Sequence, residues 1–195
     1  MLRRILIPFL CLLGLFCTLQ AQDAPALKIA ALHPILGDMA RAIGGSHVQV
    51  ADLLRPNGNL HSFEPAPQDI AAAGQARLVL ASGKNLEPYL PKLKDALGGR
   101  AQILDLGASI PDVPVAADTA DHDHGHDGDC CAHGPNDPHW WHTPANMKRA
   151  ARALAAALTR MDPAHEQDYK AGLARWNRKM DQLSSWARKE LADIP

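Results

Sequence analysis

One stretch near the middle of the chain holds most of the side chains that could bind a metal ion. DHDHGHDGDCCAHGPNDPHWWH, residues 121–142, contains six of the ten histidines and two adjacent cysteines. Imidazole, carboxylate and thiolate groups are all zinc ligands. The stretch therefore indicates metal binding, and the fold must decide which of these groups are held in a fixed position.

The first part of this stretch predicts an auxiliary, metal-gathering loop. Its histidines alternate with aspartate and glycine, and no apolar neighbours fix their geometry; they are His122, His124, His126 and His133. Each binding mode would be weak because the loop must become ordered upon binding. A solvated acidic loop is the alternative. A disulfide between Cys130 and Cys131 would strain the backbone, which leaves thiolate ligation or an intermolecular contact open.

The second part, NDPHWWHTP, offers His139 and His142 immediately before a predicted helix. The preceding proline restricts the backbone, so a histidine here can be aimed at a fixed point. We expect one of the two to be a ligand and the other to lie beside it or against Trp140 and Trp141. The alternative is that the tryptophans are core residues and both histidines make local hydrogen bonds.

A third candidate ligand is His61, in the segment RPNGNLHSFEPAPQDI. It follows a predicted strand, and ligands of open α/β sheets gather at the carboxyl ends of the strands. The Asn57–Asn59 turn can present its imidazole. His33 follows the first predicted strand at the same edge, where we expect a structural or supporting role.

The elements that must position these residues alternate along the chain. Short apolar runs predict strands at 27–32, 47–54, 77–82 and 101–106, and helices are predicted at 34–45, 65–76, 86–99, 143–161 and 163–193. Strand–helix alternation predicts an α/β fold with a four-stranded, mostly parallel sheet covered on both faces. The segment 107–137, which has no periodicity, is long enough to be a functional loop.

The last predicted helix carries apolar residues every three or four positions, which are Tyr169, Leu173, Trp176, Met180, Leu183, Ala187 and Leu191. A helix of this span is about 45 Å long, more than a lobe of this size needs to cover its sheet. It is either a long cover helix or a spine that leads to a further part of the protein.

The N-terminus and the composition limit the class of protein. A basic start, an apolar run at 5–19 and the small residue Ala21 predict a Sec signal peptide over 1–21 and hence a periplasmic protein. The formal net charge of −1 gives no indication of nucleic-acid binding. Nucleophile-elbow, Walker A, dinucleotide-binding and zinc-protease motifs are absent from the sequence, so no enzyme is expected. We expect a metal-binding lobe over 22–142 and a helical segment over 143–195.

The order of these motifs resembles one family. HSFEPAPQDI, the His/Asp loop, DPHWWHTPANMKRAARALAAAL and the long helix are similar to the zinc/manganese ABC-transporter solute-binding proteins, cluster A-I of the periplasmic binding proteins. The resemblance covers the chain from about Leu27 to Pro195. It implies that His61 and His139 are direct ligands and that residues 121–133 correspond to the family's histidine-rich loop. His142 lies outside the family's ligand positions.

The resemblance also implies a function. The expected protein binds Zn²⁺ with high affinity and delivers it to the membrane permease of an ABC transporter, with a periplasmic metallochaperone as a further candidate partner. The family has a second αβ lobe with the remaining ligands, and the full-length protein is expected to be a monomer. This chain ends where that lobe should begin, so we expect a fragment; a natural truncation with a weaker site is the alternative.

Other functions stay open on the sequence alone. A manganese (Mn²⁺) or iron solute-binding protein would have the same fold, and a permease-independent zinc buffer or chaperone would rely on the His/Asp loop. A zinc hydrolase would need a general base near His61, for which Glu64 is the candidate. Ligation by neutral imidazoles predicts that metal affinity falls below about pH 6, where histidines ordinarily become protonated.

Overall fold

The computed structural model describes residues 25–114 and 136–193. The predicted signal peptide lies outside these ranges. So do the auxiliary histidines His122, His124, His126 and His133 and the cysteine pair. The chain is built as four strands and five α-helices joined by short 3₁₀ turns within the described ranges.

The predicted sheet is confirmed, and all of its strand pairs are parallel. Its strands run in the order β2-β1-β3-β4. Their bounds are β1 Leu27–Ala31, β2 Val48–Asp52, β3 Leu78–Ala81 and β4 Gln102–Asp105. Ala31, the last residue of β1, pairs with Asp52 on one side and with Leu80 on the other. The carboxyl ends of all four strands therefore meet at one edge of the sheet.

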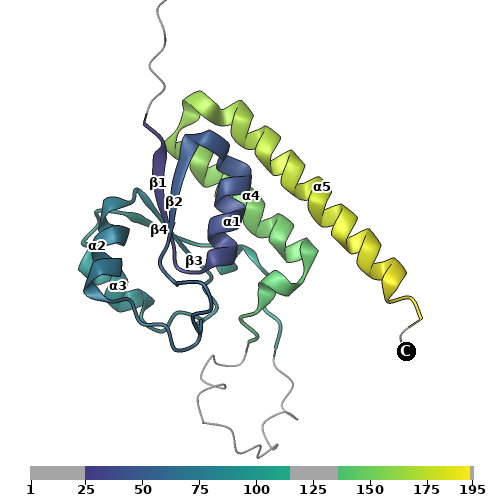
Figure 1. Ribbon diagram of the computed structural model, residues 1–195, viewed down its shortest axis with the longest axis horizontal. Helices are drawn as coiled ribbons and strands as arrows, with labels where there is room; N and C mark the ends of the chain where they lie inside the picture. The colour runs from purple at the N-terminus through teal and green to yellow at the C-terminus, as the bar shows by residue number, and fades with distance from the viewer. Residues whose placement is uncertain (1–24, 115–135, 194–195) are drawn as a thin grey trace, which may run out of the picture.

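Helices cover both faces of the sheet (Figure 1). Their bounds are α1 Pro34–Gly44, α2 Pro67–Gln75, α3 Leu90–Leu97, α4 Pro144–Met161 and α5 Glu166–Glu190. One apolar core joins the sheet to α1, α4 and α5, and a second joins it to α2 and α3. The strand β3 is buried at every residue because it lies between these two layers. This is the two-sided burial that parallel sheets require.

Helix α3 begins later than the sequence predicts. The expected start was Leu86, but the helix begins at Leu90. The buried carboxylate of Glu87 accepts the backbone N–H groups of Ser82 (2.7 Å) and Gly83 (2.9 Å) instead of facing solvent from a helix. Pro88 and Pro91 also favour a helix start near this point. The apolar spacing alone could not show that Glu87 belongs to the preceding loop.

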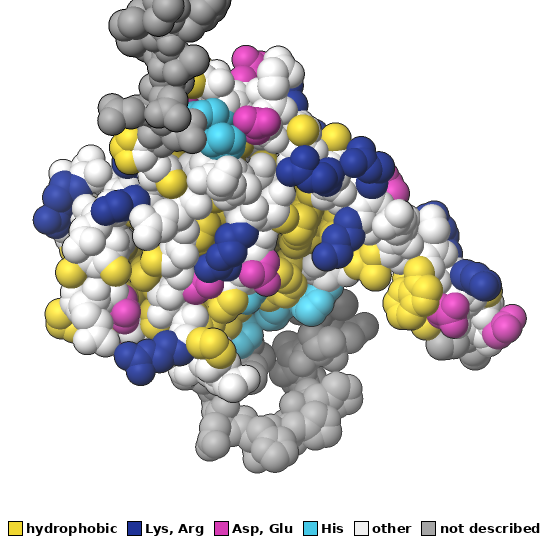
Figure 2. All heavy atoms as spheres, turned by 45° about the horizontal axis from the view of Figure 1, so that its top comes forward, with side chains coloured by type: hydrophobic (Ala, Val, Ile, Leu, Met, Phe, Trp, Pro, Cys, Tyr) yellow, Lys and Arg dark blue, Asp and Glu magenta, His cyan; other side chains and the backbone are white. Residues whose placement is uncertain are grey.

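Helix α5 is shorter than predicted and is covered over only part of its length. It begins at Glu166 after the 3₁₀ turn η5 (Pro163–His165), and its 25 residues span about 38 Å. The apolar stripe is buried at Tyr169 and Met180. Farther along, Leu183, Trp186 and Leu191 are 45%, 59% and 57% exposed. Figures 1 and 2 show this end of α5 projecting beyond the rest of the molecule.

Three sets of contacts fix the start and the covered part of α5. Gly172 lies so close to the backbone carbonyl of Ile43 at the end of α1 that no side chain would fit there. Near the start of the helix, the ring of His165 stacks on that of His47 in the turn η1 (Gly45–His47), with ring centres 3.8 Å apart. The carboxylate of Asp162 accepts hydrogen bonds from Tyr169 Oη (2.6 Å) and His165 Nδ1 (2.7 Å).

No helix within residues 25–114 or 136–193 combines the length and hydropathy that a bilayer-spanning segment requires.

Candidate metal centre

His61 lies in the loop that leads from β2 to α2, on the carboxyl-end side of the sheet. Asn57 has a positive φ of 66°, and the N–H of Gly58 donates to Arg55 O at 3.0 Å, which closes the predicted turn. The backbone N–H of His61 then donates to Asn59 Oδ1 at 2.9 Å. This local bonding fixes the backbone of an exposed histidine beyond the sheet edge.

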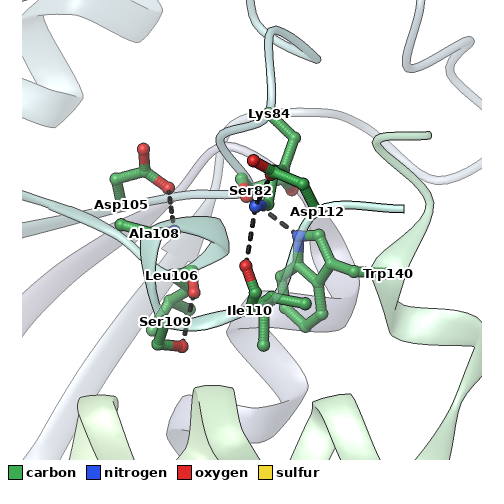
Figure 3. A network of polar contacts seen from close by, with 9 residues as sticks. All are labelled: Ser82, Lys84, Asp105, Leu106, Ala108, Ser109, Ile110, Asp112 and Trp140. Atoms are coloured by element: carbon green, nitrogen blue, oxygen red, sulfur yellow. Dashed lines mark hydrogen bonds and ion pairs between the residues drawn. The ribbon is translucent and has the colours of Figure 1, made fainter. Parts of the chain in front are cut away.

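His139 reaches the same edge from the other end of the chain. It is the residue before the 3₁₀ turn η4 (Trp140–His142), which leads into α4. The next residue, Trp140, is buried, and its indole Nε1–H donates to Ser82 O at 2.9 Å (Figure 3). Because Ser82 directly follows β3, this bond fastens the backbone beside His139 to the end of a central strand.

The two histidines that the sequence identified are brought together. His61 Nε2 and His139 Nε2 are 3.3 Å apart, and the ring centres are 5.2 Å apart. Two nitrogens bound to one tetrahedral zinc ion at 2.0–2.1 Å would be about 3.3–3.4 Å apart. The same distance also allows a hydrogen bond between the two rings. The spacing is therefore compatible with a shared ion.

Asp137 controls which nitrogen of His139 faces His61. Its Oδ1 accepts the backbone N–H of His139 at 2.9 Å and lies 2.7 Å from His139 Nδ1. The first of these bonds is the main reason that the pKa of Asp137 is lowered, and the side-chain bond adds to it. An ionised carboxylate can only accept, so Nδ1 carries the proton and Nε2 presents its lone pair. This is the carboxylate–histidine arrangement that supports metal ligation.

Two further histidines lie near this pair. The ring of His142 is exposed, and its centre is 6.1 Å from that of His139. The ring of His33 packs edge-on against Trp141, with centres 4.9 Å apart, and its Nδ1 is buried with no hydrogen-bond partner among the described residues. Burial lowers the pKa of His33 to about 4. His33 is therefore a neutral packing residue behind the site.

The described residues bring together two candidate ligands rather than a complete coordination shell. Within residues 25–114 and 136–193, no three His, Cys, Asp or Glu side chains are arranged to hold one ion. Glu64, the candidate base for a hydrolase, lines a cavity of about 280 Å³ with Pro65, Tyr89 and Lys92.

Sequence reasoning missed the residues that hold the site together. The available signal for Asp137 was its place two positions before a candidate ligand. That spacing is equally typical of an aspartate in a turn, so it did not show that Asp137 contacts the ring of His139. The bond from Trp140 to Ser82 had no signal in the sequence because it joins residues 58 positions apart. Figure 3 shows Trp140 bonded to Ser82, which lies two positions before Lys84 in the loop after β3.

Comparison with known proteins identifies relatives of this chain. The family model described as "Zinc-uptake complex component A periplasmic" (ZnuA) matches residues 29–195. The iron-binding protein YfeA of Yersinia pestis is 29% identical over 90% of this chain and 52% of its own length. The manganese ABC transporter substrate-binding lipoprotein PsaA of Streptococcus anginosus is 26% identical over 98% of this chain and 61% of its own.

Solved structures show the same fold. A crystal structure of ZnuA is 28% identical, with a TM-score of 0.73 over 87% of this chain and 60% of that one. A ZnuA deletion mutant with zinc bound is 27% identical, with a TM-score of 0.75 over the same shares. The chain thus spans about half to three fifths of the length of these relatives. With a family match over most of its length and this shared fold, the chain belongs to the ZnuA family.

Proposed function

We propose that this chain is the metal-binding lobe of a periplasmic solute-binding protein that captures Zn²⁺ and delivers it to the membrane permease of an ABC transporter. His61 and His139 are the ligands that this lobe contributes, through Nε2 in each case. The observation that carries the proposal is the 3.3 Å separation of the two Nε2 atoms. A signal peptide over residues 1–21 would export the protein.

The proposed role of each residue follows from its chemistry. Neutral imidazole nitrogens bind zinc well, and the Asp137 carboxylate makes His139 a better donor by accepting its Nδ1 proton. The side chain of His139 is 34% exposed and His61 is exposed, so an ion can enter and leave without unfolding the lobe. Water or groups outside the described residues would complete the coordination shell.

Zinc is proposed over manganese because this lobe offers nitrogen ligands. Manganese favours sites rich in carboxylate and carbonyl oxygen. The alternative has support in the names of the relatives, since one is called iron-binding and another belongs to a manganese transporter. Zinc would displace manganese from most protein sites, so the test is the metal that the protein carries when it is purified from the periplasm without added metal. The proposal expects zinc, and manganese or iron in its place would favour the alternative.

The test of the site is a zinc titration against a competing chelator. His61→Ala and His139→Ala should each weaken the tightest site by more than about 100-fold, because each removes a direct ligand. His165→Ala is the matched control, since His165 lies at the joint between α4 and α5 rather than beside this pair. Full affinity in either ligand variant would show that the assignment is wrong.

A zinc buffer that acts without a permease would bind instead through residues 121–133, which lie outside the described ranges. The flanking segments at 113 and 137 are joined by a 2.8 Å backbone hydrogen bond, so residues 115–120 and 134–135 could still connect them after this stretch is deleted. One tight site should remain in the deletion variant if the transport proposal holds. Its loss would favour the buffer.

A further inference from the structure

The loop after β3 has an unusual backbone. Three successive residues have positive φ angles: Gly83 (70°), Lys84 (55°) and Asn85 (62°). Glycine and asparagine adopt this conformation readily, but a lysine seldom does. A lysine at such a position suggests that its side chain has a task that a glycine or asparagine could not perform.

The side chain of Lys84 is directed at a single segment. Its ammonium group donates to the backbone carbonyl of Ile110 at 2.7 Å and forms an ion pair with Asp112 (Figure 3). The side chain is only 12% exposed. Lys84 therefore fastens residues 110–112, which follow β4, to the loop at the end of β3.

That segment is in turn bonded to the backbone beside the metal centre. Val113 O accepts the backbone N–H of Asp137 at 2.8 Å, and Pro114 and Asn136 form an antiparallel bridge. Asp137 then holds His139 through the 2.7 Å contact between its Oδ1 and Nδ1 of the ring. Described contacts thus run without a break from Lys84 to His139.

The same loop also holds the far side of His139. Ser82 accepts the indole N–H of Trp140 at 2.9 Å, and the N–H groups of Ser82 and Gly83 are held by the buried Glu87 carboxylate. Residues on both sides of His139 are thereby attached to one short, internally bonded loop. Such double attachment limits how far the imidazole can move away from His61.

We propose that Lys84 is a positioning residue for metal binding, which acts through residues 110–113 and Asp137 to hold His139 at the spacing that a divalent cation requires. The inference rests on the proposed function and names an additional residue on which the affinity of that site depends. Lys84 itself does not touch the ion.

The test is Lys84→Asn, measured in the full chain by zinc titration against a chelator. Asparagine tolerates the positive φ, so the backbone of the loop is retained while the two contacts to residues 110–112 are lost. The zinc dissociation constant should rise about 3- to 10-fold, less than for direct removal of a partner of the ligand. Lys84→Arg should restore most of the affinity because it keeps a cation at this place.

Lys94→Gln is the charge control, since it removes one positive charge from an exposed position on α3 and should leave affinity unchanged. Urea unfolding of each variant confirms that the titrations compare folded protein. A double-mutant cycle with Asp137→Asn tests the route: the two changes should be less than additive because they interrupt one chain of contacts. Equal affinity of Lys84→Asn and the original chain, or full additivity in the cycle, would overturn the proposal.

A metal-free measurement separates this inference from the proposed function. In nuclear magnetic resonance spectra, the Nδ1 proton of His139 should exchange with water faster in Lys84→Asn than in the original chain. If the original chain bound no zinc but the proton still exchanged faster in Lys84→Asn, the proposed function would be wrong and the positioning role of Lys84 would stand. Zinc binding with unchanged proton exchange would contradict the positioning role alone.

Discussion

At the scale of single residues, the candidate site consists of two imidazoles that meet and one carboxylate that orients one of them, that of His139. His61 and His139 are 78 positions apart in sequence, and their Nε2 atoms are 3.3 Å apart. His61 could be selected from the sequence because it follows a predicted strand. His139 could be selected, together with His142, because it precedes a predicted helix, and the family resemblance favoured His139. The actual distance between His61 and His139 could not be predicted, since it depends on the turn at Asn57, the bond from Trp140 and the contact with Asp137.

We expect Asp137→Asn to weaken zinc binding about 10- to 100-fold without removing a ligand. Asparagine can still accept a hydrogen bond through its amide oxygen, but it has no negative charge to strengthen the donor nitrogen of His139. Isothermal calorimetry of the variant beside Asp95→Asn, which alters an exposed carboxylate on α3 outside the contacts that hold His139, would measure the difference. A zinc affinity equal to that of the control would show that Asp137 does not support metal binding by His139.

His33 predicts a pH dependence of stability that is separate from metal binding. Burial depresses the pKa of His33 from 6.5 to about 4, so the unfolded chain binds more protons at this residue than the folded chain between these values. Its contribution to stability is therefore present above about pH 6.5 and is lost as the pH falls towards 4.

The corresponding variant is His33→Leu, which cannot take up that proton. Its free energy of unfolding should fall less between pH 7 and pH 5 than that of the original chain, as measured by urea denaturation. Gln75→Leu, at an exposed position without a titratable group, is the control and should keep the original slope. Parallel pH profiles for His33→Leu and the original chain would contradict the assignment.

At the scale of elements, apolar patterning predicted the sheet well because strands that are buried on both faces must be apolar along nearly their whole length. The four apolar runs contain the four strands to within two residues at each end. The start of α3 was misplaced because Glu87 is buried by its hydrogen bonds rather than by its hydropathy. The contact of Gly172 with α1 could not be predicted either, because a glycine in a helix does not indicate which helix packs against it.

Gly172→Ala should destabilise the fold by about 1–3 kcal/mol through overpacking against Ile43, even though alanine favours helices. Thermal or urea unfolding would measure this change. Arg175→Ala, at a nearby exposed position on the same helix, should change the unfolding free energy by no more than about 0.5 kcal/mol. If the two variants were equally stable, α1 and α5 would not approach as closely as described.

At the scale of the whole molecule, one edge of the sheet brings the two candidate ligands together while α5 extends away from it (Figure 1). The apolar stripe on α5 was predicted from its spacing, but the point at which burial stops, after Met180, could be seen only in three dimensions. Whether an ion is shared by the two histidines is the central question, because the family match and the fold do not by themselves identify the ligands.

The most direct measurement is a crystal structure of the zinc-loaded protein with anomalous scattering collected at the zinc absorption edge. If the two histidines share an ion, one strong anomalous peak will lie between the imidazoles, about 2.0–2.1 Å from Nε2 of both His61 and His139. A peak bound to only one of these nitrogens, or lying elsewhere on the molecule, would contradict the proposed shared site.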